Sequence, residues 1–103
     1  MGFLGRLFGG FRVDEQLVDE LISLLNRIDR ICEQDYSSAI KEGTPLNKEW
    51  KACDARLYEI GEELYEKGGI NLMRKVYARV YKKGRLTGRY LEHAWSGIGE
   101  WMG

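Results

Sequence analysis

Residues 14–43, DEQLVDELISLLNRIDRICEQDYSSAIKEG, decide the fold class, because their apolar side chains recur at spacings of three and four. That period places them on one face of an α-helix, whereas a half-buried strand would alternate at every second residue. Asp14 is typical of a helix N-cap and Gly43 of a helix stop. The predicted core face comprises Leu17, Val18, Leu21, Ile22, Leu25, Ile28, Ile31, Cys32, Ala39 and Ile40.

A second helix is expected directly after this stretch. Thr44 and Pro45 suit an N-cap and the first helical position, because proline lacks only a donor that is unpaired there anyway. The helical period then continues over about residues 46–67, and Gly68-Gly69 is expected to end the helix. Its predicted inner face comprises Trp50, Cys53, Leu57, Ile60 and Leu64, with Tyr65 at its edge.

Two further helices are expected in the last third of the chain. Asn71 suits the cap of a helix ending near residue 83, with Gly84 as the left-handed residue after it. A last helix is expected over about 87–101, weakened by its two internal glycines. Short connections favour antiparallel neighbours. The sequence therefore predicts an all-α fold, an up-down antiparallel helical bundle of about four helices whose first two are long and form a helical hairpin.

Length and composition fit a single domain of an ordinary globular protein. The chain has 103 residues, 44% hydrophobic and 31% charged. We divide it into an apolar Gly/Phe-rich amphipathic segment, residues 1–13, and one helical domain, residues 14–103. No apolar run approaches the roughly 20 residues that span a bilayer. The start lacks the features of a secretory signal, so the sequence predicts a cytoplasmic protein.

The first residues, MGFLGRLFGGF, would place their large apolar side chains on one face of a short helix, with Arg6 off that face. This run resembles the short amphipathic membrane-targeting segment of MinD-type division ATPases, which lies at the opposite terminus in that family. The resemblance covers about a tenth of the chain and implies peripheral membrane contact without ATPase activity, because there is no P-loop. Packing onto the helical domain or onto a dimer interface is the main expectation for this segment, and peripheral membrane contact or a mobile tail are the alternatives. The residues concerned are Phe3, Leu4, Leu7, Phe8 and Phe11.

Charge is sharply segregated along the chain, although sixteen basic residues balance sixteen acidic ones. Residues 14–66 carry fourteen Asp and Glu against six Lys and Arg. Residues 67–89 carry eight basic residues and no acidic one. Such asymmetry indicates either an anionic partner for the basic part or docking of the two parts on each other, within one chain or between two.

The expected third helix has two distinct halves. Leu72, Met73, Val76, Tyr77, Val80 and Tyr81 fill one half of its helical wheel, and cations fill the other. The candidate anion- or partner-binding residues are Arg74, Lys75, Arg79, Lys82, Lys83, Arg85 and Arg89. Nucleic-acid binding by this face is the alternative function, but the neutral chain, with a pI near 6.6, lacks the basic balance usual for such domains.

No catalytic, metal or cofactor site is indicated by the remaining residue types. His93 is the only histidine and has no spaced partner for a metal. Cys32 and Cys53 show no CxxC pattern, and we expect two core thiols, with a reversible disulfide across the hairpin as the alternative. The glutamates of the second helix are expected to form a solvated face.

From these observations we expect a small non-enzymatic module for protein–protein interaction or self-association. We also expect it to form a homo-oligomer. No cofactor and no small-molecule substrate are expected. Large aromatic side chains dominate the energetics of interfaces, so Trp95 and Trp101 join the N-terminal aromatics as candidate contacts.

Overall fold

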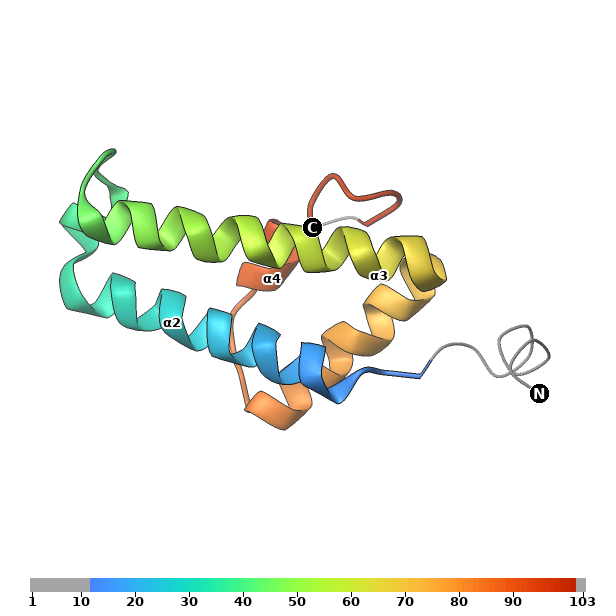
Figure 1. Cartoon of the computed structure of the whole chain (residues 1–103). Coiled ribbons are helices and arrows are strands. Elements are labelled where there is room, and N and C mark those ends of the chain that lie inside the picture. The colour runs from blue at the N-terminus through green and yellow to red at the C-terminus, as the bar shows by residue number, and fades with distance from the viewer. Residues whose placement is uncertain (1–11, 102–103) are drawn as a thin grey trace.

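The computed structural model describes residues 12–101, and these form an all-helical structure (Figure 1). Helix α2 spans Glu15–Ile40, α3 spans Pro45–Gly84 and α4 spans Tyr90–Ala94. Helices hold 79% of the described residues, which contain no strand. The all-α fold class is therefore confirmed, but two long helices and one short helix stand where four were predicted.

Helix α2 begins as its sequence predicts. The Asp14 carboxylate accepts a hydrogen bond from the backbone N–H of Gln16 at 2.9 Å, which satisfies one of the free donors at the helix start. The buried residues of α2 follow the helical period: Val18, Leu21, Leu25, Ile28, Ile31 and Ala39. Asp35 interrupts the helix with an extended backbone, and its carboxylate accepts from the Ser38 N–H at 3.1 Å, so it caps the last turn anew.

Helix α3 replaces the two helices predicted over 46–83. The Thr44 hydroxyl accepts from the Asn47 N–H at 3.1 Å and Pro45 occupies the first turn, as the sequence predicts. Gly69 then leaves the helical conformation, with φ 67° and ψ −161°, and the helix resumes at once. The predicted break therefore falls at Gly69, but the glycine pair bends the chain without an intervening loop, so the two predicted helices adjoin within the single element α3.

The first half of α3 lies alongside α2 in the opposite direction (Figure 1). Arg56 binds Glu20 at 2.7 Å, and Arg27 binds Glu49 at 2.8 Å. The residue numbers rise along one helix as they fall along the other, which defines an antiparallel pair. Beyond Gly69 the chain turns back, and Arg79 meets Glu15 at 3.0 Å near the start of α2.

The C-terminal part differs from the predicted helix over 87–101. Helix α4 contains only five residues, and the chain beyond it follows turns in which Gly97 and Gly99 have φ values of 94° and 50°. These left-handed conformations stop a helix. The end of α3 also differs, because Arg85, with φ 51°, is its left-handed cap in place of Gly84.

Trp95 holds this C-terminal part against α3. It is fully buried, and its indole N–H donates to the Leu57 carbonyl at 2.8 Å. Gly61 makes the contact possible, since a β-carbon there would lie 2.6 Å from the Trp95 ring and 2.7 Å from Ile98. One core cluster therefore includes residues from α2, both halves of α3 and the segment around α4.

Within residues 12–101, no helix is both long and apolar enough to cross a membrane.

Candidate binding site

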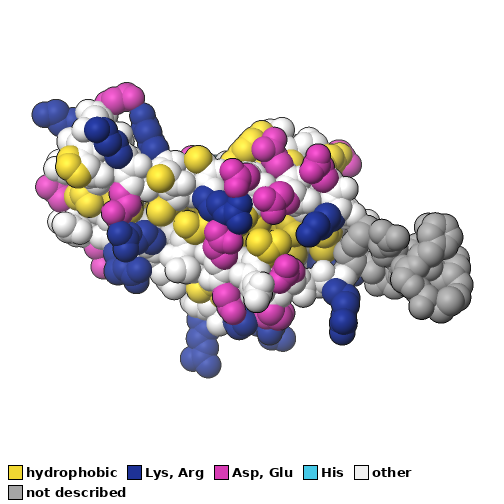
Figure 2. All heavy atoms as spheres, viewed as in Figure 1, with side chains coloured by type: hydrophobic (Ala, Val, Ile, Leu, Met, Phe, Trp, Pro, Cys, Tyr) yellow, Lys and Arg dark blue, Asp and Glu magenta, His cyan; other side chains and the backbone are white. Residues whose placement is uncertain are grey.

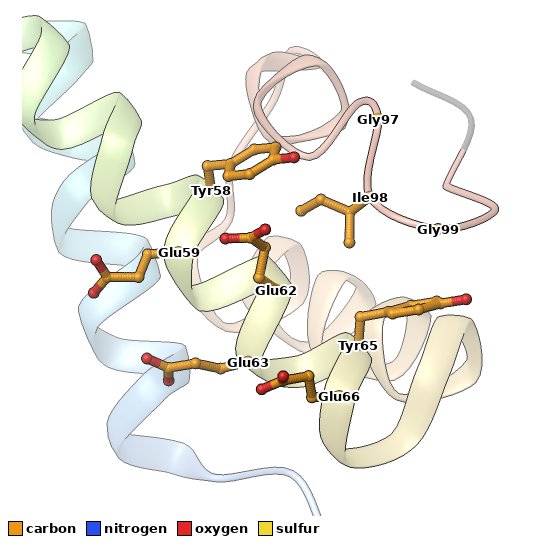
Figure 3. A pocket seen from close by; sticks show the side chains of 9 residues that line it. All are labelled: Tyr58, Glu59, Glu62, Glu63, Tyr65, Glu66, Gly97, Ile98 and Gly99. Carbon is orange, nitrogen blue, oxygen red and sulfur yellow. The ribbon is translucent and has the colours of Figure 1, made fainter.

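A pocket lies between the first half of α3 and the turns after α4 (Figure 3). Its volume is about 400 Å³. The α3 side supplies four glutamates and two tyrosines, and the C-terminal turns supply Ile98 between two glycines. The lining residues are Tyr58, Glu59, Glu62, Glu63, Tyr65, Glu66, Gly97, Ile98 and Gly99. Among residues 12–101, no lysine, arginine or histidine lines it, so the side chains that line it carry a net negative charge.

The four glutamates divide into two kinds by their surroundings. Glu59 and Glu63 extend toward α2 (Figure 3), where Arg56 binds both of them in addition to Glu20. Glu62 instead points between Tyr58 and Ile98. Within the described residues, Glu62 and Glu66 have no cationic partner. The net charge of the pocket is therefore carried mainly by these two carboxylates.

The C-terminal wall of the pocket is held by Tyr65. Its hydroxyl donates to the Glu100 carboxylate, and this hydrogen bond is the main reason why the pKa of Tyr65 is raised. Gly99 passes so close that a β-carbon there would lie 2.3 Å from the Tyr65 ring. The aromatic ring thus lies directly beneath the turn that closes the pocket.

The structure divides the basic face that the sequence predicts. Arg79 binds Glu15, and Lys83 binds both Glu15 at 3.0 Å and Asp19 at 2.8 Å. These cations favour the ionised form of Glu15. Its pKa is lowered chiefly by the hydrogen bond from Arg79 and then by the one from Lys83. Two of the candidate partner-binding residues therefore join α3 to α2 within the chain.

The other cations of this stretch lie at the surface. Arg74, Lys75, Lys82 and Arg85 are exposed and, among residues 12–101, form no ion pair. Arg89 binds Glu92 at 2.8 Å. Figure 2 shows acidic and basic side chains interspersed over the face formed by α2 and α3, so the segregation along the sequence does not produce a single-sign surface on that side.

Tyr77 and Tyr81, which the sequence places on the apolar half of the third predicted helix, pack against the core. The Tyr77 and Tyr81 rings stack at 4.5 Å, and the Trp101 ring lies 5.5 Å from Tyr77. Burial, the largest cause, raises the pKa of Tyr77 to about 12. Trp101 is half-buried and remains a candidate contact, whereas Trp95 is fully buried and cannot serve as a surface contact in this fold.

The remaining candidates take simple positions. Cys32 is partly buried and Cys53 is buried, both as free thiols, and burial is the main cause that raises the pKa of each. His93 is exposed. The part of the chain that the structure describes holds no group of three His, Cys, Asp or Glu suited to a metal ion. Phe3, Leu4, Leu7, Phe8 and Phe11 lie outside the described residues.

Sequence reasoning missed the acidic pocket. It treated the glutamates of this helix as a solvated face and gave Tyr58 no role. The i, i+3 and i+4 spacing of Tyr58, Glu62, Tyr65 and Glu66 was the available signal, because residues so spaced share one helix face. The contribution of Ile98 and its flanking glycines depends on tertiary packing and left no such signal.

Comparison with known proteins returns no similar family, curated protein or solved structure. Any functional conclusion therefore depends on the geometry of the chain itself.

Proposed function

We propose that this chain is a small non-enzymatic protein-interaction module that binds a cationic segment of a partner protein in the acidic pocket. One observation carries the proposal: a pocket of about 400 Å³ is lined by four glutamates and two tyrosines and, within the described part of the chain, by no cation. The volume lies within the range of ordinary ligand sites. A lysine or arginine side chain would meet the carboxylates of Glu62 and Glu66.

The tyrosines add a second attraction for a cation. A guanidinium or ammonium group over a tyrosine ring gains about 0.5–1 kcal/mol at an exposed site. Tyr58 is 38% exposed and Tyr65 is partly buried, so both rings border the open volume. A flat guanidinium stacks on such a ring better than an ammonium does. We therefore expect arginine-containing segments to bind more tightly than lysine-containing ones.

Calorimetric titration with tetra-arginine, tetra-lysine and an uncharged tetrapeptide tests this function. Glu62→Gln/Glu66→Gln should abolish binding of both cationic peptides while leaving the fold intact. The matched control is Asp29→Asn/Glu33→Gln, which removes two charges from exposed positions of α2. Equal loss of binding in both variants would indicate nonspecific attraction to net charge and would contradict a site in the pocket.

Nucleic-acid binding through the basic face is the alternative proposal. Exposed Arg74, Lys75 and Lys82 support it, whereas the engagement of Arg79 and Lys83 by Glu15 and Asp19 removes part of the predicted face. Binding of labelled nucleic-acid duplexes and single strands, measured at two salt concentrations, tests this alternative. Contacts to phosphates must weaken steeply as salt rises. Absence of binding at low salt would exclude this alternative.

Peripheral membrane contact is a separate proposal for residues 1–11. It is supported by the apolar side chains of this segment, and one cation among them gives little attraction to anionic lipid. Phe8→Ser/Phe11→Ser should lower the binding of the full chain to liposomes. Unchanged liposome binding, oligomeric state and partner capture would show that the segment has none of the proposed roles.

A last proposal concerns topology. We propose that the helical segments form an up-down bundle, in which the two halves of α3 on either side of Gly69 count as two members.

A further inference from the structure

We infer that this chain can exchange residues 70–101 with a second copy of itself by straightening α3 at Gly69, which yields a domain-swapped dimer. Gly69 is the only residue of α3 with a non-helical backbone. A change in this one residue would therefore convert the bent α3 into a continuous helix of 40 residues. At a rise of 1.5 Å per residue, such a helix is about 60 Å long.

The hinge divides the described residues into two parts with an extensive shared interface. Residues 12–68 comprise α2 and the first half of α3, and residues 70–101 comprise the second half of α3, α4 and the C-terminal turns. Five residues of the second part hold the first by polar contacts. The contacts are Arg79 and Lys83 with Glu15, Lys83 with Asp19, Tyr90 with Trp50 and Asp54, Trp95 with Leu57, and Tyr65 with Glu100.

Straightening of α3 would remove all of these contacts from a single chain. It would also expose the buried faces of Trp95, Val76 and Val80, which belong to the common core. A lone open chain is therefore strongly disfavoured. A second open chain offers the identical complementary surface, so reciprocal exchange rebuilds every contact with the same partners. The occupant of the exposed surface is thus a second copy of this chain.

The backbone of Gly69 supplies the bias between the two forms. Its φ of 67° and ψ of −161° fall in a region that is essentially restricted to glycine. A residue with a β-carbon is strained there, although open space surrounds the position. In a continuous helix the same residue would be favourable, because alanine stabilises helix interiors relative to glycine. Glycine at position 69 therefore favours the closed monomer.

The exchange would also change which chain supplies each wall of the acidic pocket. Its glutamates and tyrosines belong to residues 58–66, whereas Ile98 and the flanking glycines belong to the exchanged part. In the dimer each pocket would therefore be built from two chains. The inference itself does not depend on the function proposed for the pocket.

Gly69→Ala in the full chain tests the exchange, with mass measured by size-exclusion chromatography and light scattering. The strain relieved and the helix propensity gained in both chains should lower the dimer dissociation constant on the order of 100-fold or more. The matched control is Gly43→Ala, which places alanine at another open position with positive φ, 89°. Pro45 prevents a continuous helix across that turn, so this variant should remain monomeric.

A distance measurement separates exchange from side-by-side association. Spin labels at Lys48→Cys and Lys82→Cys, in a Cys32→Ala/Cys53→Ala background, read the bend in α3. Labelled chains refolded with excess unlabelled chains report only distances within one chain. A straight helix places the two Cα atoms about 51 Å apart, from 34 residues at 1.5 Å each, whereas the bent helix holds them closer.

A Gly69→Ala dimer with the long distance supports the exchange. A folded Gly69→Ala monomer, or a dimer with the short distance of the bent helix, overturns it. If Gly69→Ala does not fold, the wild-type chain refolded at high concentration decides by the same two measurements. A dimer with the long distance then supports the exchange, and a wholly monomeric protein overturns it.

Discussion

At the scale of single residues, Gly61 determines how closely the C-terminal part can approach α3. A β-carbon at this position would lie 2.6 Å from the Trp95 ring and 2.7 Å from Ile98. Both neighbours are buried, so either must shift within the core to admit the β-carbon. We predict that Gly61→Ala lowers the free energy of unfolding by about 1–3 kcal/mol, as overpacked cores usually do. Urea denaturation measures this, and exposed Glu62→Ala on the same helix should change it by less than about 0.5 kcal/mol.

Asn47 is the one buried polar side chain of the described residues, and it closes the turn between α2 and α3. Its amide donates to the Ala39 carbonyl at 2.8 Å, and its oxygen accepts from the Gly43 N–H at 3.4 Å. Asn47→Ala leaves these backbone groups unpaired, so we predict a loss of about 1–3 kcal/mol in the free energy of unfolding. Chemical denaturation checks it, with Lys48→Ala as the exposed control; equal stability of both variants would contradict the role of Asn47.

At the scale of helices, Arg56 links α3 to α2 through Glu20. Hydrogen bonds from Arg56 are the main reason why the pKa of Glu20 lies below its ordinary value of 4.5. A lowered pKa in the folded state means that the ion pair contributes fully above pH 4.5 and is lost as the pH falls through the lowered value. The side chains are 33% and 38% exposed, so screening limits the contribution to about 1 kcal/mol or less.

We therefore predict that Glu20→Gln is less stable than the wild type at pH 7 and that the difference disappears in acid. Denaturation curves recorded at both pH values provide the measurement. Glu33→Gln, at an exposed position of the same helix, should match the wild type throughout. A stability difference that stays constant from pH 7 into acid would show that Glu20 acts through packing instead of charge.

Helices with local signals were predictable from the sequence, and those stabilised by distant contacts were not. The caps at Asp14 and Thr44 depend on neighbouring residues alone, and both occur where predicted. The bend at Gly69 was located, but its sharpness was not, since a glycine pair fits either a loop or a single non-helical residue. The short α4 depends on the burial of Trp95 against Gly61, which no local pattern reveals.

The candidate site was predictable only in its charge. The basic stretch and the acidic helices were evident, but which cations pair within the chain depends on the bend in α3. Only the turned-back helix brings Arg79 and Lys83 to Glu15. The acidic pocket needs the turn at Ile98 for its wall, so it too emerged only in three dimensions.

At the scale of the whole molecule, the shared core predicts that residues 12–101 unfold in one cooperative step. Val18 of α2, Leu57 and Val76 from the two halves of α3, and Trp95 beyond α4 belong to one cluster. Loss of any one part would expose apolar surface on the others, so partly folded forms are disfavoured. The three tryptophans report on two places, because Trp50 lies on α3, whereas the rings of Trp95 and Trp101 pack against each other at 5.1 Å beyond α4.

Three variants each keep one tryptophan and have the other two changed to phenylalanine. Within each variant, the urea transition followed by tryptophan fluorescence should therefore coincide with the one followed by far-UV circular dichroism. Agreement must be sought within a variant, since Trp95→Phe removes the hydrogen bond to Leu57 and shifts the midpoint itself. An earlier transition for the Trp101 reporter than for circular dichroism would show that the C-terminal turns detach first. The pocket beside Ile98 would then open before the helices unfold, and cationic peptides would bind only the fully closed molecule.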